Sequence, residues 1–172
     1  MTTPAAADWP PAAIATERLV LRAAEARDRP AFIELFASEE VGTHQGGARP
    51  RAELEEAVPD VPGQRPGFFV VAVAGEMAGA VTLDLRGTGE TELGYLFLPR
   101  VWGHGYATEA CGAALAWCAR TRPGAPVVLT TRTANVRSMR LAERLGFTEV
   151  KRFHEWGAEQ WRGEWSPGAP AR

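Results

Sequence analysis

The segment from Leu98 to Thr108 has the residue types of an anion-binding turn. Pro99 removes a backbone donor where a strand-like stretch ends, and Gly103 and Gly105 lead directly into a helical pattern. In such a turn, successive backbone N–H groups and the positive end of the helix dipole can bind a phosphate group. The alternative interpretation is a glycine turn that only connects a strand to a helix.

Two familiar phosphate-binding motifs do not match this segment. No Gly-Lys-Ser/Thr sequence follows Gly105, so the lysine and the magnesium-binding hydroxyl of a P-loop are missing. A dinucleotide-binding fingerprint follows the first strand of its fold, whereas this turn follows the fourth predicted strand. The sequence therefore disfavours both nucleotide-binding classes.

Three separated motifs occur in an order typical of one family. The first is Thr16-Glu17-Arg18-Leu19-Val20-Leu21-Arg22. The second is Leu93-Gly94-Tyr95 followed by Trp102-Gly103-His104-Gly105-Tyr106-Ala107-Thr108-Glu109-Ala110, and the third runs from Asn135-Val136-Arg137-Ser138 to Leu145-Gly146-Phe147. Over residues 16–165 the chain resembles the GNAT N-acetyltransferases, and more narrowly their ribosomal-protein N-terminal acetyltransferase (RimJ/RimL-like) branch.

The resemblance implies a fold and a cosubstrate. The expected fold is the α+β (mixed α/β) GNAT acyl-CoA N-acyltransferase fold, with helices on both faces of a single mixed sheet that is splayed between its fourth and fifth strands. Those strands are expected at residues 90–98 and 127–133, with acetyl-CoA between them. No metal is expected, because no zinc-type Cys/His spacing occurs.

The resemblance also implies which residues contact the coenzyme. A bulge at residues 96–98 would free a backbone N–H for the thioester carbonyl, and Phe97 is the expected donor. Trp102 replaces the usual first residue of the family's motif, and His104 is expected to offer its main chain rather than an acid or base. The implied cofactor-binding residues are Phe97, Leu98, Trp102, Gly103, His104, Gly105, Ala107, Thr108, Asn135, Ser138 and Arg140, with Arg137 and Arg140 as candidates for the 3′-phosphate.

Acyl transfer to an amine requires a neutral amine, a donor for the developing oxyanion and a proton for the departing thiolate. Glu92 is the expected catalytic base, with Asp84 as a weaker competitor; a solvent-facing Glu92 without a catalytic role is the alternative. Many family members use a tyrosine as the acid, but Ala142 occupies that position here. Ser138 is the catalytic candidate on the same helical face, unless its hydroxyl only bonds back to its own helix.

The acceptor is expected to be a protein N-terminus or a small amine. A lysine-like amine is only about 0.04% neutral at pH 7, whereas an α-amine is about 10 to 15% neutral, so an N-terminal acceptor depends less on a strong base. The resemblance implies that His44 and Gln45 line the acceptor side, while Glu53, Glu55 and Glu56 form a solvated helix face. The rival function is a non-catalytic acyl-CoA-binding module.

Sequence patterns place these residues on the elements of one domain. Alternation and β-branched content predict strands at residues 16–22, 68–74, 77–85, 90–98, 127–133, 148–156 and 159–165. Helices are predicted at residues 30–36, 51–58, 106–120 and 135–145, with Asp28 and Asn135 as N-caps and Gly146 after the last helix. Residues 1–15 and 166–172 are expected to be a flexible arm and tail, 41–50 a flexible loop, and 16–165 the acetyltransferase domain.

Composition excludes several other classes of protein. The 172 residues include 19 basic and 21 acidic ones and are 45% hydrophobic, which argues against a dedicated nucleic-acid binder and against disorder. Neither a signal-peptide pattern nor a membrane-spanning run occurs, so a cytoplasmic monomer or homodimer is expected. Cys111 and Cys118 lie about 10 Å apart on the buried face of a predicted helix, so neither a disulfide nor a cysteine nucleophile is expected.

Overall fold

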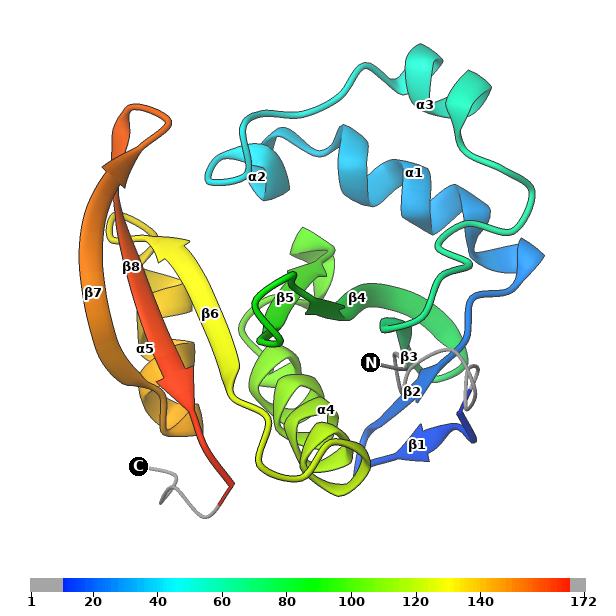
Figure 1. Cartoon of the computed structure of the whole chain (residues 1–172). Coiled ribbons are helices and arrows are strands. Elements are labelled where there is room, and N and C mark those ends of the chain that lie inside the picture. The colour runs from blue at the N-terminus through cyan, green and yellow to red at the C-terminus, as the bar shows by residue number, and fades with distance from the viewer. Residues whose placement is uncertain (1–10, 168–172) are drawn as a thin grey trace. The chain divides into compact units, whose positions relative to one another are not determined.

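The computed structural model describes residues 11–167, which contain eight strands. The strands are β1 (Ile14–Ala15), β2 (Leu19–Arg22), β3 (Phe68–Val73), β4 (Glu76–Leu85), β5 (Thr91–Phe97), β6 (Val127–Arg132), β7 (Thr148–Glu155) and β8 (Ala158–Trp165). The helices are α1 (Arg29–Ala37), α2 (Glu39–Gly42), α3 (Arg51–Ala57), α4 (Tyr106–Thr121) and α5 (Val136–Leu145), with short 3₁₀ turns η1 (Ala26–Asp28) and η2 (Pro99–Val101) (Figure 1).

The strands are hydrogen bonded in the order β1-β2-β3-β4-β5-β6-β8-β7. β5 and β6 are parallel, through the pairs Thr91 with Val127 and Glu92 with Val128, whereas β2–β3, β6–β8 and β7–β8 are antiparallel. The sheet is therefore mixed, and the predicted fold class is confirmed. The expected splay between β5 and β6 stays a prediction.

Contacts divide the chain into two compact units. The first comprises the residues through Thr82 together with Tyr95–Ala110, and the second comprises Leu83–Gly94 and the residues from Cys111 onward. In the first unit, one side of α1 packs on the sheet in a core made of Leu35, Phe68, Val70, Met77, Ala80 and Leu98. Another side of α1 buries Ile33 against Leu54 and Val58. Because Leu98 is buried in the sheet core, the chain enters the glycine turn from a fixed point.

The second unit contains the helix with the clearest end signals. The Oδ1 atom of Asn135 accepts the N–H of Ser138 at 3.2 Å, which satisfies one of the unpaired donors at the start of α5. Gly146 follows the helix with a left-handed φ of 89°. Both predicted ends of this helix are confirmed. β7 and β8 form the predicted hairpin, which turns through Trp156 and Gly157.

The structure differs from the expectations in two loop segments. Ile14 and Ala15, at the end of the expected arm, pair with Leu21 and Val20 as strand β1. The expected loop at residues 41–50 begins with the end of helix α2, whose N-cap Ser38 accepts the N–H of Val41 at 3.2 Å. The rest of the expected arm, residues 1–10, and the tail from 168 lie outside the described residues.

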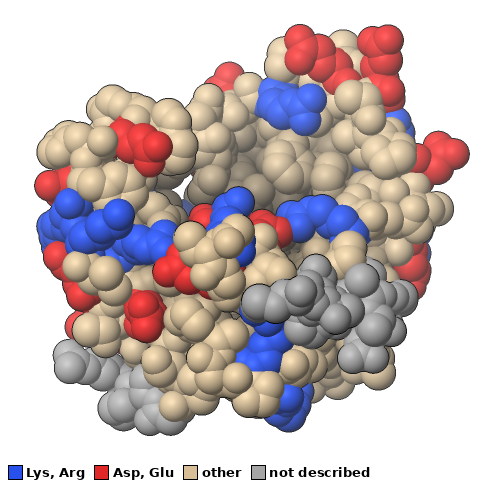
Figure 2. Space-filling view, viewed as in Figure 1, with Lys and Arg blue, Asp and Glu red and all other residues tan. Residues whose placement is uncertain are grey.

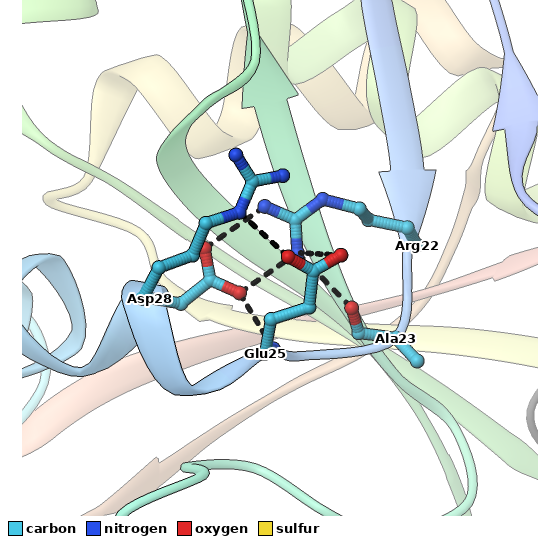
Figure 3. Close-up of polar contacts among 5 residues, drawn as sticks. Arg22, Ala23, Glu25 and Asp28 are labelled. Carbon is cyan, nitrogen blue, oxygen red and sulfur yellow. Dashed lines mark hydrogen bonds and ion pairs between the residues drawn. The ribbon is translucent and has the colours of Figure 1, made fainter.

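Asp28 occupies the predicted N-cap position of α1, but its side chain makes no capping hydrogen bond there and forms a buried ion pair instead. Its carboxylate accepts from Nη1 and Nη2 of Arg22 at 2.7 and 2.9 Å and from the backbone N–H of Glu25 at 2.7 Å (Figure 3). Burial acts to raise the pKa of Asp28, but the bonds from Arg22 and Glu25 outweigh it and hold this pKa below its ordinary value. The Asp28 side chain thus binds Arg22 on β2 rather than the backbone N–H groups at the start of α1.

Asp28→Asn is expected to lower the free energy of unfolding by about 2 to 3 kcal/mol at pH 7, because it removes the charge from a buried, hydrogen-bonded pair. Since the pKa of Asp28 is lowered on folding, this contribution is complete above about pH 4 and is lost as the pH falls through the folded-state pKa. Urea unfolding at several pH values measures it. Glu34→Gln, which breaks the exposed Arg100–Glu34 pair, is the control and should change stability by less than about 1 kcal/mol.

Candidate active site

The glycine turn between β5 and α4 has the backbone of an anion-binding loop. Gly103 and Gly105 have φ values of 82° and 77°, in the left-handed region that favours glycine. Before them, η2 is closed by Val101 N–H donating to the Leu98 carbonyl at 3.0 Å. The predicted glycine pair therefore serves a conformation that other residues rarely adopt.

Six successive backbone amides, from the glycine turn into the first turn of α4, have no acceptor in the part of the chain that the structure describes. Among residues 11–167, no hydrogen-bond acceptor is bound by the backbone N–H of any residue from 103 to 108. The next amide along the chain, that of Glu109, is paired and donates to the Gly105 carbonyl at 3.1 Å. Such unpaired donors at the positive end of a helix favour a negatively charged ligand. Gly103, His104 and Gly105 in the loop and Ala107 and Thr108 in the first turn of α4 thus share one run of unpaired amides.

His104 is held against the loop. Its Nδ1 atom lies 3.1 Å from the Val101 carbonyl and 3.0 Å from the Trp102 carbonyl, and because carbonyls only accept, this nitrogen carries the proton. The imidazole ring also stacks on Tyr106, with ring centroids 5.3 Å apart. Nδ1 is therefore bound to the loop, and only Nε2 is left to act as an acid or base.

The end of β5 is fixed by hydrogen bonds on both sides of one peptide. The N–H of Leu98 donates to the Ala78 carbonyl on β4 at 2.9 Å, and the Phe97 carbonyl in the same peptide accepts from Nε1 of Trp102 at 2.8 Å. A planar trans peptide directs these two groups oppositely, so the Phe97 carbonyl points away from β4. Leu98 is fully buried and its amide is bonded to the Ala78 carbonyl, which leaves Phe97 as the expected backbone donor; the expected contact of Leu98 with the coenzyme stays a prediction.

Glu92, the expected base, lies in the second unit and is already paired. Its Oε2 atom accepts from Nε of Arg86 at 2.7 Å, and its side chain is 28% exposed. The bond to Glu92 also raises the pKa of Arg86 above its ordinary value. The Glu92 carboxylate is therefore partly open to solvent, but one of its oxygens already accepts a hydrogen bond from Arg86.

The other expected residues of the second unit lie on α5. Ser138 is buried, as the helical face predicted, one turn before the buried Ala142 that occupies the tyrosine position. Asn135 is committed to capping the helix, and Arg140 is exposed. Glu92, Asn135, Ser138 and Arg140 thus belong to one unit, and the glycine turn to the other.

The first unit also contains the expected acceptor-side residues. His44 is half-buried and Gln45 is exposed, in a turn where the Gln45 N–H donates to the Gly42 carbonyl at 2.9 Å. Gly42 is required there, because an added Cβ would lie 2.6 Å from the carbonyl carbon of Gly47. The three glutamates of α3 are exposed as predicted, and Figure 2 shows acidic side chains gathered where this helix lies.

Sequence reasoning missed an interaction at the glycine turn. Arg18 donates from Nη1 to the His104 carbonyl at 2.7 Å and pairs through Nε with Glu109 at 2.8 Å. The signal was present, because Arg18 lies in the first family motif and Glu109 in the second. No periodicity relates residues 91 positions apart, however.

Both cysteines are unsuited to nucleophilic attack. Cys111 and Cys118 are buried as free thiols, and burial raises the pKa of each. Within residues 11–167, every helix is too short or too polar to span a lipid bilayer.

Comparison with known proteins identifies the family. A family model described as the acetyltransferase (GNAT) domain matches residues 18–148. A curated relative, the uncharacterized protein YkkB of Bacillus subtilis (strain 168), is 28% identical over 153 residues, covering 83% of this chain and 89% of its own length. The chain therefore belongs to the GNAT acetyltransferase family, as the motifs predicted, and is an acetyl-CoA-dependent N-acetyltransferase.

Solved structures share the fold over nearly the whole chain. A GNAT-family acetyltransferase from Bacillus anthracis matches with a TM-score of 0.76 and 20% identity, covering 90% of this chain and 98% of that one. A complex of RimL, a ribosomal L7/L12 alpha-N-protein acetyltransferase, with coenzyme A matches with a TM-score of 0.72 and 18% identity, covering 92% and 99%. The ribosomal-protein branch is thus among the fold neighbours.

Proposed function

We propose that the enzyme transfers acetyl from acetyl-CoA to the primary amine of a protein N-terminus or a small molecule by direct attack. The amine nitrogen forms a bond to the thioester carbonyl carbon, the C–S bond breaks, the nitrogen loses a proton and the thiolate gains one. The observation that carries this proposal is the run of six unspent amides at residues 103–108, which suits the coenzyme diphosphate. Burial of both cysteines supports a route without a covalent intermediate.

The backbone N–H of Phe97 is our proposed donor to the thioester oxygen. In an extended strand the N–H and C=O of one residue point to the same side. Since the Phe97 carbonyl points away from β4 toward Trp102, the Phe97 N–H points away from β4 as well. A backbone donor held in place before the reaction stabilises the oxyanion without reorganisation.

The proton transfers are assigned to two side chains of the second unit. Glu92 is the proposed base, acting directly or through water, and its bond to Arg86 fixes the orientation of its carboxylate. Ser138 or water is the proposed proton donor to the thiolate. Asn135 and Arg140 are proposed to contact the pantetheine arm and the 3′-phosphate, and His44 and Gln45 to line the acceptor side.

A protein α-amine is the first acceptor class to test. RimL, a fold neighbour, is described as an alpha-N-protein acetyltransferase. A base that is shared with Arg86 also suits an α-amine, since about 10% of such amines are already neutral at pH 7. A lysine side chain would require a much stronger base.

Thiol release from acetyl-CoA, measured over a panel of acceptors, tests the proposal. The panel pairs a peptide with a free N-terminus against the same peptide with a blocked N-terminus and an internal lysine, and adds polyamines. We expect acceptor-dependent release that is fastest with the free N-terminus or with one small amine. Binding of CoA, seen as a raised melting temperature, without acceptor-dependent release would instead support the non-catalytic module.

Glu92→Gln is expected to lower kcat/KM about 100-fold or more and to change the pH–rate profile, because general base catalysis contributes about 10² to 10⁴ in rate. Steady-state kinetics from pH 5 to 9 measures both. Glu90→Gln is the matched control, since Glu90 also pairs with an arginine of the second unit, Arg162, at 2.6 Å. A Glu92 variant that keeps the parent's rate and profile would remove the base from this mechanism.

We also propose a cytoplasmic location and a monomeric or homodimeric state. The two free thiols fit a reducing compartment. Cell fractionation and light scattering test the two statements.

A further inference from the structure

The first family motif is attached to the glycine turn by one carboxylate. Glu109, in the first turn of α4, accepts from Oγ1 of Thr16 at 2.6 Å, from the backbone N–H of Arg18 at 3.1 Å and from Nε of Arg18 at 2.8 Å. Burial acts to raise the pKa of Glu109, but these bonds outweigh it and hold the pKa below its ordinary value. Glu109 is therefore a charged anchor that fixes the guanidinium of Arg18.

From that anchor, Arg18 determines the orientation of a peptide within the turn. Its Nη1 atom donates to the His104 carbonyl at 2.7 Å, and its Cζ atom lies 4.7 Å from the centroid of the Tyr106 ring. In the planar trans peptide between His104 and Gly105, the carbonyl and the N–H point in opposite directions. The bond from Arg18 therefore directs the Gly105 N–H away from Arg18. This matters at glycines 103 and 105, because a residue without a Cβ leaves the backbone free to rotate.

The remaining nitrogen of Arg18 is uncommitted. Within residues 11–167, Nη2 binds no acceptor, and it lies 3.5 Å from the position that a Cβ would occupy on residue 105. The Arg18 side chain as a whole is 43% exposed. Because the guanidinium is held by Glu109, the His104 carbonyl and the Tyr106 ring, it can hold the His104–Gly105 peptide in one orientation.

We propose that Arg18 is a positioning residue for the diphosphate of acetyl-CoA, acting by holding the His104–Gly105 peptide in the orientation that presents the Gly105 amide. The proposal rests on the proposed binding of the diphosphate at residues 103–108. It assigns a role in coenzyme binding to Arg18 of the Thr16–Arg22 motif, which lies 91 residues before Glu109 in the sequence.

The test compares a cosubstrate that has the diphosphate with one that lacks it. Arg18→Ala should raise the Kd for CoA and the KM for acetyl-CoA about 10- to 100-fold, the effect of losing a charged hydrogen bond, while kcat at saturation stays near the parent value. The kcat/KM for S-acetylpantetheine, which has no diphosphate, should not change. Arg18→Lys should fall between Arg18→Ala and the parent, because one ammonium cannot bind Glu109 and the His104 carbonyl in fork geometry.

Arg27→Ala is the matched control, since it removes another exposed arginine of the same unit that pairs with a glutamate, Glu25, at 2.6 Å. It should leave kcat/KM unchanged for both acetyl-CoA and S-acetylpantetheine. Melting without ligand reports any loss of folding; if Arg18→Ala does not fold, Arg18→Gln and Arg18→Lys carry the comparison. Equal losses of kcat/KM for acetyl-CoA and S-acetylpantetheine, or an unchanged Kd for CoA in the variants, would overturn the proposed role of Arg18. Either result would leave the proposed function standing. A parent protein that does not bind CoA would overturn the proposed function, and this inference with it.

Discussion

Gly105→Ala is expected to lower kcat/KM for acetyl-CoA about 100-fold, which corresponds to the loss of one or two charge-assisted hydrogen bonds. Gly105 has a φ of 77°, and this backbone region costs other residues about 1 to 2 kcal/mol. An alanine relieves that strain by rotating the turn, which redirects the amides on either side of residue 105. Steady-state kinetics with varied acetyl-CoA should show the effect mainly as a raised KM.

Gly124→Ala provides a control with the same backbone strain. Gly124 also has a φ of 77°, and an added Cβ there meets no atom within 4 Å. It lies in the turn between α4 and β6, outside residues 103–108. Both variants should lose similar stability, but only Gly105→Ala should lose affinity. Equal effects on acetyl-CoA affinity would show that the 103–108 turn has no special part in binding.

Gly79→Ala is expected to lower the free energy of unfolding by about 3 kcal/mol and kcat about 100-fold. A Cβ on residue 79 would overlap the Leu96 carbonyl oxygen and would lie 2.7 Å from Cδ1 of Phe97. A backbone oxygen moves only if its strand moves, so the end of β5 must shift. That shift displaces the Phe97 N–H, the proposed donor to the thioester oxygen.

Urea unfolding measures the first effect, and kcat corrected for the folded fraction measures the second. Gly87→Ala is the control, because an added Cβ in the loop between β4 and β5 meets nothing within 4 Å. It should change stability by less than about 0.5 kcal/mol and leave kcat unaltered. A Gly79→Ala enzyme that is destabilised but retains full kcat would argue against Phe97 as the oxyanion donor.

Local signals in the sequence predicted the elements and the glycine turn well. Asn135 and Gly146 were correctly placed at the two ends of α5, because capping and left-handed backbone depend on neighbours within four residues. The pair Gly103 and Gly105 was identified for the same reason, since glycine is the residue that adopts a positive φ at little cost. The motifs around these residues predicted the family that the comparisons identify.

Interactions of charged side chains were predicted poorly. Asp28 has the residue type of a helix cap, but Arg22 offers it two charged donors and takes it away from the helix end. Glu92 was considered as a base or as a solvated side chain, and it proved to be paired with Arg86. In each case the partner comes from another element, and residue type alone does not specify which of many arginines that will be.

The sequence by itself determined where the helices and most of the strands lie, which turn has unpaired amides and which family the chain belongs to. Each of these depends on residues that are close together in the chain or on a contiguous motif. Only the tertiary structure decided that Arg18 and Glu109 meet at this turn, and that the Phe97 peptide is held by Ala78 on one side and Trp102 on the other. Hydrogen bonds between distant residues follow no sequence period, because they are set by how the strands and α4 pack.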